Sequence, residues 1–203
     1  MRKIGIFVDG REEQISLRHM VEKLKIDHVQ ILTPVYANMQ PKGPVGSIVK
    51  AVEAKMTLHK QADLIVVLID LEDLEECIIA RAQALKMAFH QKGYSKVEVV
   101  VKNQQFENWL IADPEAISQL DRFHITTTFK KKVENDKADN VANPVGLLSG
   151  LKKDGKTFHK TIDGTQIAKK LNIENAARNS RSLRRFLRLL GHRDYVHQSK
   201  KPN

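Results

Sequence analysis

Two acidic residues directly follow the most apolar stretches of this sequence. The run KIGIFV, residues 3–8, leads into Asp9, and the run LIVVLI, residues 64–69, leads into Asp70. A carboxylate at the end of a buried strand is costly to keep charged unless a cation or hydrogen-bond donors compensate it. A divalent cation, which prefers hard carboxylate oxygens, is one candidate partner.

Further acids stand close to Asp70. Glu72 lies two residues on, so in an extended strand both side chains would project from one face, with Cα atoms roughly 6.6–7 Å apart. Asp73 follows at once. Carboxylates this close raise each other's pKa unless cations lie between them. Magnesium suits such a site, and two ions can hold the attacking and leaving oxygens of a phosphodiester.

These acids also have structural explanations. Acids after strands often cap the next helix, as Asp73 would do, and Asp113 would cap a helix that restarts at the following proline. Glu12 and Glu13 would stabilise a helix N-terminus through the helix dipole. Strand-end acids have many unrelated roles in α/β proteins. The spacing alone therefore leaves a metal site and a set of helix caps both open.

The hydrophobic pattern predicts the elements that must position these acids. Apolar runs predict strands, and apolar residues at helical spacing predict helices between them. The expected strands cover residues 3–8, 28–35, 62–73 and 96–103, and the expected helices cover 12–24, 47–61, 74–93 and 106–120, the last broken at Pro114. This alternation predicts an α/β fold with a mostly parallel, Rossmann-like sheet flanked by helices. Ligand sites in such sheets lie beyond the carboxyl ends of the strands, where Asp9 and Asp70 should meet.

The pattern changes after residue 121. Residues 125–144 are polar and lysine-rich without a clear period, which predicts a long loop or mobile arm. Short helical segments are expected within 144–153, 164–173 and 180–191. We therefore divide the chain into an α/β domain, residues 1–121, and a basic loop and helical extension, residues 122–203, packed on it.

Positive charge is concentrated in the second part. The formal net charge is +10, but residues 1–121 hold 15 Lys and Arg against 17 Asp and Glu, whereas residues 122–203 hold 19 against 7. This asymmetry favours a polyanionic partner, and arginine matches phosphate oxygens bidentately. The candidate nucleic-acid contacts are Lys130, Lys131, Lys132, Arg181, Arg184, Arg185 and Arg188. A solvated basic surface, or a helix that docks an acidic protein, would have the same composition.

The composition excludes several classes of protein. The single cysteine, Cys77, excludes a disulfide framework and a cysteine-rich zinc site, and its place on an apolar helix face predicts that it is buried. Phe106 and Trp109, three residues apart on a helix, are expected in the core. The longest apolar run is far shorter than the roughly 20 residues of a membrane helix, and the N-terminal residues lack a signal-peptide pattern. We expect a soluble, cytoplasmic protein.

Several segments together resemble a known domain. An apolar strand ending in acid-Gly, followed by a strand ending in acid-x-acid, resembles the Toprim domain of topoisomerases, bacterial primases and overcoming-lysogenization-defect (OLD) nucleases. The resemblance extends through ADLIVVLIDLEDLEE, VVVKNQQFENWLIADPEAI and TFHKTIDGTQIAKKLNIENAARNSRSLRRFLRLLG. Together these segments are similar to short, uncharacterised prokaryotic Toprim-like proteins, which are often encoded beside AAA-type or ABC-type ATPases.

The resemblance implies a function and a set of site residues. Asp9 stands where Toprim domains usually have Glu, and Asp70-Leu71-Glu72 stands for Asp-x-Asp. The implied activity is that of a Mg²⁺- or Mn²⁺-dependent endonuclease acting on DNA or RNA in a defence or DNA-processing system, with an ATPase partner. Its implied catalytic residues are Asp9, Glu13, Asp70, Glu72 and Glu107, and its implied metal ligands are Asp9, Asp70, Glu72, Asp73 and Glu107.

Two other functions remain open. The departures at Asp9 and Glu72 would also fit a degenerate site, in a non-catalytic nucleic-acid-binding or regulatory subunit of an ATPase complex. Phosphoryl transfer to a small molecule has weaker support, because the sequence has no glycine-rich phosphate-binding loop. The choice between DNA and RNA and the oligomeric state also stay open.

Overall fold

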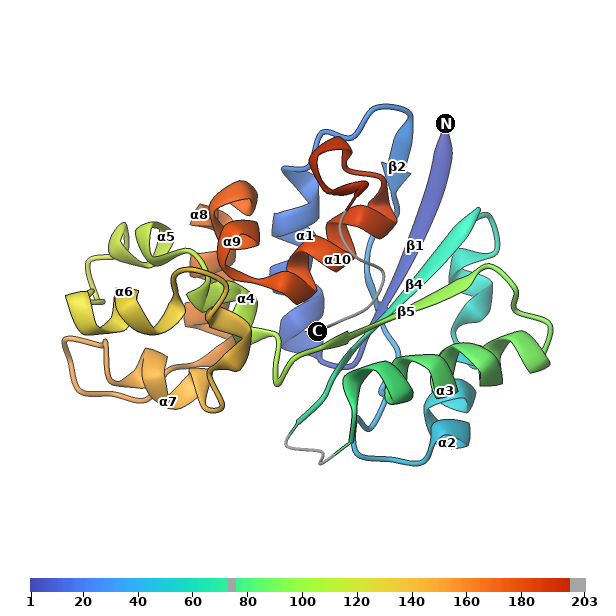
Figure 1. Cartoon of the computed structure of the whole chain (residues 1–203), viewed down its shortest axis with the longest axis horizontal. Helices are drawn as coiled ribbons and strands as arrows, with labels where there is room; N and C mark the ends of the chain where they lie inside the picture. Colours follow the sequence, from blue (N-terminus) through green and yellow to red (C-terminus); the bar gives the residue numbers. More distant parts are fainter. Residues whose placement is uncertain (73–75, 198–203) are drawn as a thin grey trace.

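The chain forms an α/β fold around one sheet in the computed structural model, which describes residues 1–72 and 76–197 (Figure 1). The strands are β1 Arg2–Val8, β2 Val29–Ile31, β3 Val35–Tyr36, β4 Leu64–Asp70 and β5 Val97–Lys102. All of the paired strands run parallel, in the order β2-β1-β4-β5, and β3 also pairs with β1. The predicted fold class, a mostly parallel sheet flanked by helices, is confirmed.

Strand β4 is apolar along its length because both of its faces are covered. Val66 and Leu68 belong to the core on one side of the sheet, and Val67 and Ile69 belong to the core on the other. Side chains alternate between the faces along a strand. Asp70 therefore continues the face that carries Val66 and Leu68, and this face holds the candidate site.

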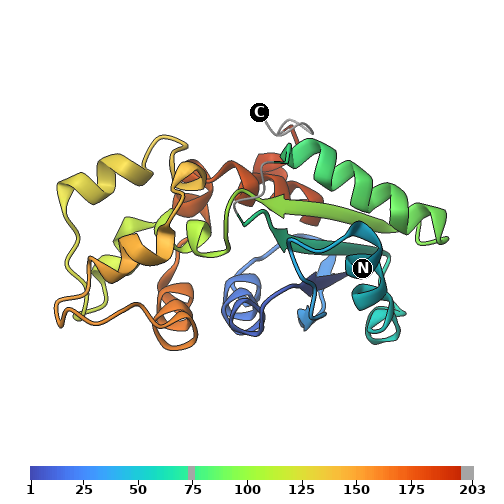
Figure 2. The same cartoon turned by 90° about the horizontal axis from the view of Figure 1, so that it is seen from below.

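Helices from distant parts of the sequence cover the two faces (Figure 2). Helix α1, Arg11–Glu22, and helix α10, Arg181–Leu190, contribute to the core on the face of Val66. Helix α2, Val45–Glu53, and helix α3, Ile78–Gln91, contribute to the opposite core. The helix layer beside the candidate site is thus completed by the C-terminal part of the chain.

The remaining helices gather at one end of the molecule, past the carboxyl ends of the strands (Figure 1). They are α4 Glu107–Ile111, α5 Pro114–Ser118, α6 Thr127–Val133, α7 Pro144–Ser149, α8 Thr165–Lys170 and α9 Ile173–Asn179, with a π-helical turn, η3, at Lys160–Gly164. Short 3-10 turns lie at η1 Met56–His59, η2 Ala138–Asn140 and η4 Arg193–Tyr195. We call the group from α4 to α9 the helical lobe.

Three expectations about local structure were wrong. The expected strand over 28–35 is two short strands, β2 and β3. The polar segment 125–144 contains α6, whose apolar signal is only Phe129 and Val133, both buried at i,i+4 spacing among lysines. Cys77 is exposed because it precedes the first residue of α3 rather than lying within the helix.

The helical lobe, helix α10 and the sheet share one core. Leu183, Phe186 and Leu187 of α10 are buried in the same cluster as Ile4 and Ile6 of β1. As expected, Phe106 and Trp109 are also buried in this cluster. The Trp109 indole donates a hydrogen bond to Ser182 Oγ at 2.7 Å, so residues on the two sides of position 121 are joined inside the core.

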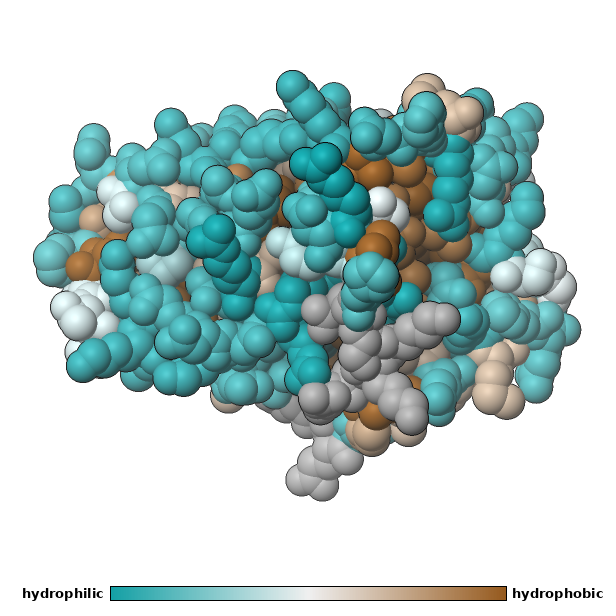
Figure 3. Space-filling model, turned by 45° about the horizontal axis from the view of Figure 1, so that its top comes forward, coloured by the Kyte–Doolittle hydropathy of each residue, from teal (hydrophilic) through white to brown (hydrophobic). Residues whose placement is uncertain are grey.

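One face of the molecule is largely hydrophilic (Figure 3). On the face drawn in Figure 3, hydrophilic side chains cover most of the molecule, and apolar side chains are visible mainly in one area at the right, where the sheet lies. Among the described residues, no helix combines the length and the apolar character needed to cross a membrane.

The packing of β1 against η1 predicts that substitution by alanine has different effects on stability at two glycines. A Cβ added at Gly5 would lie 2.6 Å from Cγ of His59, which is 3% exposed and packs edge-on against Phe7. We expect Gly5→Ala to lower the free energy of unfolding by about 1–3 kcal/mol, the usual range for overpacking. Urea unfolding followed by circular dichroism measures it.

Gly46→Ala is the matched control. Gly46 lies in α2, and a Cβ there would meet no atom within 4 Å. Alanine favours helix over glycine by up to about 1 kcal/mol, so this variant should be neutral or slightly more stable. Equal losses at the two positions would contradict the close contact between β1 and His59.

Candidate functional site

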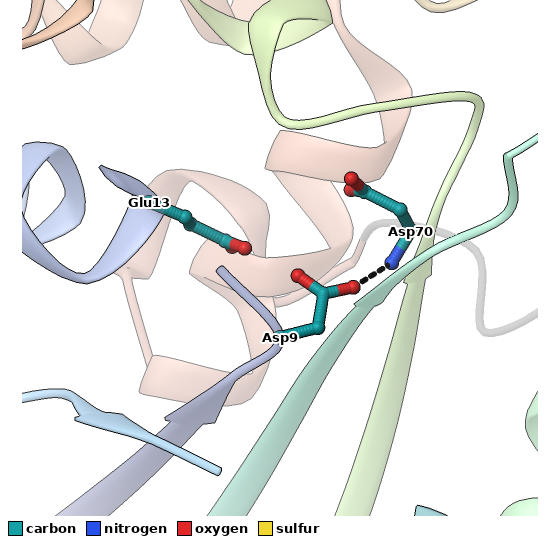
Figure 4. A group of neighbouring side chains, drawn as sticks. All are labelled: Asp9, Glu13 and Asp70. Atoms are coloured by element: carbon teal, nitrogen blue, oxygen red, sulfur yellow. Dashed lines mark hydrogen bonds between the residues drawn. The ribbon is translucent and has the colours of Figure 1, made fainter. Parts of the chain in front are cut away.

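Three carboxylates meet where the strands end (Figure 4). Asp9 follows β1, Glu13 lies in the first turn of α1, and Asp70 is the last residue of β4. Each offers one oxygen, and these oxygens all lie within 4.8 Å of one another. Because β1 and β4 are parallel neighbours, the acids that follow them must reach the same edge of the sheet.

Asp9 is held in place by the backbone. The pairing of β1 with β4 ends at Phe7 and Val67. Beyond that point Asp9 Oδ2 accepts a hydrogen bond from the Asp70 N–H at 2.7 Å (Figure 4). The carboxylate thus takes the place of a backbone carbonyl at the end of the ladder, which fixes its orientation beside Asp70.

A lysine lies at the centre of the three acids. Lys102 Nζ is 2.6 Å from Glu13 Oε2, 2.8 Å from Asp70 Oδ1 and 3.3 Å from Asp9 Oδ1. Lys102 ends β5, its side chain is 0% exposed, and its Cα pairs in register with that of Asp70. The sequence-based prediction missed this residue. The sequence does contain an indication of this residue. A lysine ends the valine-rich strand VEVVVK, which places it at the edge of the sheet where the carboxyl ends of the strands meet.

The buried charges shift one another's pKa values. Burial would lower the pKa of Lys102, but the attraction of Asp70, Asp9 and Glu13 outweighs it and raises that pKa well above its usual range. Burial, assisted by repulsion from Asp9, raises the pKa of Glu13 well above normal despite Lys102.

The pKa values of Asp9 and Asp70 are shifted in opposite directions. Burial acts to raise the pKa of Asp9, but Lys102, a hydrogen bond with Glu13 and the Asp70 N–H together lower it. Burial raises the pKa of Asp70 to about 7, with Asp9 and Glu107 adding to the rise and Lys102 opposing it. The cluster therefore holds one firmly ionised acid, Asp9, beside two acids that retain protons more readily.

A small pocket of about 50 Å³ opens beside this cluster. Its lining includes Asp9, Glu13, Asp70, Glu107 and Lys160. A water molecule needs only about 10–15 Å³ of such space, so the pocket can hold several waters or an ion with water. The sheet, helix α1 and the helical lobe all contribute residues to the wall of this pocket.

Glu107 faces the pocket from the helical lobe. It begins α4, its side chain is 6% exposed, and its Oε1 lies 3.2 Å from Nζ of Lys160 on the π-helical turn. Its Oε2 is buried and lacks a hydrogen-bond partner among the described residues. A buried carboxylate oxygen without a partner is unusual, and here it marks a free ligand atom beside Asp70.

Glu72 does not join the group, contrary to the expectation from its spacing. The strand ends at Asp70, and Glu72 adopts a left-handed backbone conformation with φ of 46°. Its N–H donates to the Gln104 carbonyl at 3.1 Å, so the two-residue alternation of a strand no longer applies. Asp73, also expected as a ligand, lies outside the described residues. Asp113 caps α5, as the structural explanation predicted.

The predicted basic residues lie in different environments. On α6, Lys130 pairs with Glu115 at 3.0 Å, whereas Lys131 and Lys132 are exposed. On α10, Arg184 pairs with Asp136 at 2.6 Å and is half-buried.

The other three arginines of α10 form a row at i, i+4 and i+7 spacing. Arg181, Arg185 and Arg188 are half-buried, and within the described part of the chain the Nε of each is a buried donor without a hydrogen-bond partner. Burial and the charge of Arg188 lower the pKa of Arg185. Arginines in such a row would gain from an anion that supplies the missing acceptors.

The donor set of the pocket suits a hard divalent cation. Asp9, Glu13, Asp70 and Glu107 supply only carboxylate oxygens, which Mg²⁺ and Mn²⁺ prefer. The Oε2 of Glu107, which has no hydrogen-bond partner in the described part of the chain, provides an available ligand atom. Lys102 already compensates part of the negative charge at the centre of the cluster. A divalent cation would therefore fit on the side of the cluster that faces the pocket, and not at its centre.

Comparison with known proteins assigns the chain to a family but gives no activity. A family model described as a domain of unknown function, DUF4276, matches residues 11–191. No curated protein and no solved structure matches the chain. The matched range contains Glu13, Asp70, Lys102, Glu107 and Lys160, and it begins two residues after Asp9.

The raised pKa of Asp70 predicts how stability depends on pH. An unfolded aspartate titrates near 3.9, whereas folded Asp70 titrates at about 7. The folded chain holds a proton that the unfolded chain releases, so this contribution to stability is complete below about pH 4 and is lost as pH rises through 7. The unfolding free energy of the wild type should therefore fall more steeply over this range than that of Asp70→Asn.

Urea unfolding at a series of pH values tests this prediction. One proton accounts for at most about 1.4 kcal/mol per pH unit, so the two curves should diverge by up to a few kcal/mol. Asp121→Asn, at an exposed position, is the matched control and should follow the wild type. Parallel curves for Asp70→Asn and the wild type would contradict the assignment.

Proposed function

The chain belongs to the DUF4276 family of unknown function, and we propose from its site that it is a metal-dependent nuclease that hydrolyses nucleic-acid phosphodiesters. The observation that carries the proposal is the set of four buried or nearly buried carboxylates around one pocket at the carboxyl edge of a parallel sheet. Acids concentrated in this way are costly to bury, and cation binding gives a reason for their presence.

The carboxylates of the pocket would have different roles, which their surroundings decide. Asp70 and Glu107, assisted by Glu13, would hold Mg²⁺ or Mn²⁺ at the pocket. A bound ion would polarise the phosphodiester and lower the pKa of an attacking water. Asp9, whose two oxygens contact Lys102 and the Asp70 N–H, would position the other acids rather than bind the ion.

Lys160 is placed to contact a substrate phosphate, and Glu13 is placed to hold a proton. Lys160 Nζ, 3.2 Å from Glu107 and on a side chain that is 46% exposed, could exchange this partner for a substrate phosphate. Glu13, buried and with a raised pKa, can hold a proton beside the reacting groups. A π-helical turn such as the one that carries Lys160 is frequent at functional sites.

The substrate would be held mainly through its phosphates. The excess of positive charge after residue 121 favours a polyanion. Arg181, Arg185 and Arg188, together with exposed Lys131 and Lys132, are the donors that support this contact. Arg184 and Lys130 already have acidic partners, Asp136 and Glu115, and would contribute less.

The wider setting rests on sequence resemblance. The Toprim-like segments support kinship with OLD-type nucleases, and hence a cytoplasmic role in prokaryotic defence or DNA processing beside an ATPase. The site itself supports only the chemistry. DNA and RNA are equally compatible with phosphate contacts made by arginine and lysine.

A second function is favoured by one specific observation. Lys102 fills the centre of the Asp9, Glu13 and Asp70 group, so a cation is already supplied there by the protein. A site balanced in this way could be purely structural, in a non-catalytic nucleic-acid-binding subunit of an ATPase complex. The two functions differ in whether the purified chain requires a divalent ion to act.

Nuclease assays test the main proposal. Single-stranded and duplex DNA and RNA are incubated with the purified chain and Mn²⁺ or Mg²⁺, and cleavage is resolved on gels. Asp70→Asn should lower the rate by about 10²-fold or more, the scale found when a group that stabilises the transition state is removed. Asp121→Asn is the matched control and should leave the rate unchanged.

The outcomes separate the two functions. Cleavage that needs a divalent ion and is lost in Asp70→Asn supports the nuclease. Cleavage that survives Asp70→Asn contradicts the site assignment. Absence of cleavage of every substrate, with or without the proposed ATPase partner, favours the non-catalytic subunit.

The arginine row gives a separate prediction for binding. Each phosphate contact contributes about 0.7–0.9 to the slope of log K against log salt. The double variant Arg185→Gln and Arg188→Gln should bind nucleic acid more weakly and lose about 1.4–1.8 from that slope, measured by fluorescence anisotropy.

An equal change of charge elsewhere is the control. Arg18→Gln with Arg193→Gln removes two side chains that are 61% and 90% exposed. This pair should leave the slope unchanged within about 0.5. If both double variants change the slope equally, the binding depends on net charge rather than on the α10 row.

A further inference from the structure

Lys102 suggests how many metal ions the site can take. We propose that the pocket binds a single divalent ion, and that Lys102 permanently supplies the second positive charge of the cluster. This inference rests on the proposed function, because it concerns the same site. Its basis is the geometry of Lys102 and the balance of charge around the pocket.

The first argument is occupancy. Lys102 Nζ lies within 3.3 Å of one oxygen from each of Asp9, Glu13 and Asp70. An ion bound by these three acids together would need their oxygens at about 2.0–2.1 Å. The ammonium already stands at that common position, so a metal ion can occupy it only if Lys102 leaves.

The second argument is that Lys102 has no favourable place to go. Its side chain is 0% exposed, and its ammonium also lies 5.7 Å from the centre of the Phe106 ring. Val100, the preceding residue on the same face of β5, is buried in the apolar core. Moving the ammonium away from its three carboxylates would leave a buried charge unpaired, at a cost of several kcal/mol.

The third argument is the set of ligand atoms that remains. Both oxygens of Asp9 are engaged, Oδ1 with Lys102 and Oδ2 with the Asp70 N–H. Asp70 keeps Oδ2, which none of these ion pairs uses. Glu13 Oε1 and Glu107 Oε2 are buried and have no hydrogen-bond partner among the described residues. Asp70 and Glu107 line the pocket, which places one ion on the pocket side, between sheet and helical lobe.

The fourth argument is charge. At its most negative, with every acid ionised, the site contains four carboxylates, Asp9, Glu13, Asp70 and Glu107, and two ammonium groups, Lys102 and Lys160. The remaining charge is −2, which one divalent ion balances. A second ion would leave an excess of +2 in a site whose lysine is fully buried, and this is unfavourable at low dielectric.

Calorimetric titration of the full chain with Mn²⁺ alone tests the inference without any measure of activity. The wild type should bind one ion per chain, and two ions per chain would overturn the proposal. Glu107→Gln should weaken the binding at least tenfold more than Asp9→Asn does, because Asp9 only positions its neighbours. The reverse order would also overturn it. Asp121→Asn is the control and should bind as the wild type does.

The variant Lys102→Met tests the role of the lysine itself. With the centre of the cluster vacated, Mn²⁺ should bind at two ions per chain, and a stoichiometry of one would contradict the proposal. If this variant unfolds without metal, Mn²⁺ should restore folding, seen by circular dichroism. Failure of Mn²⁺ to restore it would count against the lysine as a substitute for a metal ion.

The outcomes distinguish this inference from the function on which it rests. Binding of two ions by a wild type that cleaves nucleic acid would refute only the single-ion site. Absence of any Mn²⁺ binding by the wild type would refute the metal-dependent function as well.

Discussion

The contact of one buried ammonium with three carboxylates is the constraint on which the site depends. Asp9, Glu13 and Asp70 offer oxygens within 4.8 Å of one another, and without a compensating cation their repulsion would oppose folding. Lys102 supplies that cation from the neighbouring strand. The acids can therefore stay together in a folded chain, with one side of the group facing the pocket.

The architecture explains how these groups meet although they are far apart in sequence. Parallel strands bring the ends of β1, β4 and β5 to one edge, and the register sets Asp70 beside Lys102. Helix α1 begins at Arg11, two residues after Asp9, and brings Glu13 to the same edge. The helical lobe then supplies Glu107 and Lys160 and closes the pocket, and α10 anchors that lobe to the sheet.

Several features could be predicted because their causes are local. The apolar runs indicated the strands, and the topology of parallel sheets placed Asp9 and Asp70 at one edge. The prediction for Glu72 was wrong because it assumed that β4 continued, whereas the chain turns at Glu72 with a positive φ. Helix α6 was missed because its two buried residues, Phe129 and Val133, are separated by lysines.

The fold class and the edge of the sheet where acids collect could be predicted, since both follow from hydrophobic periodicity and chain direction. Which charges meet there is a property of the folded chain alone. Glu13 could have been a simple helix-dipole residue, and Lys102 an ordinary strand-end lysine. Their pairing depends on strand register and on the depth at which α1 packs. The interaction energy of buried charges depends on distances of a few ångströms between residues about 90 positions apart. These distances cannot be predicted from the local sequence.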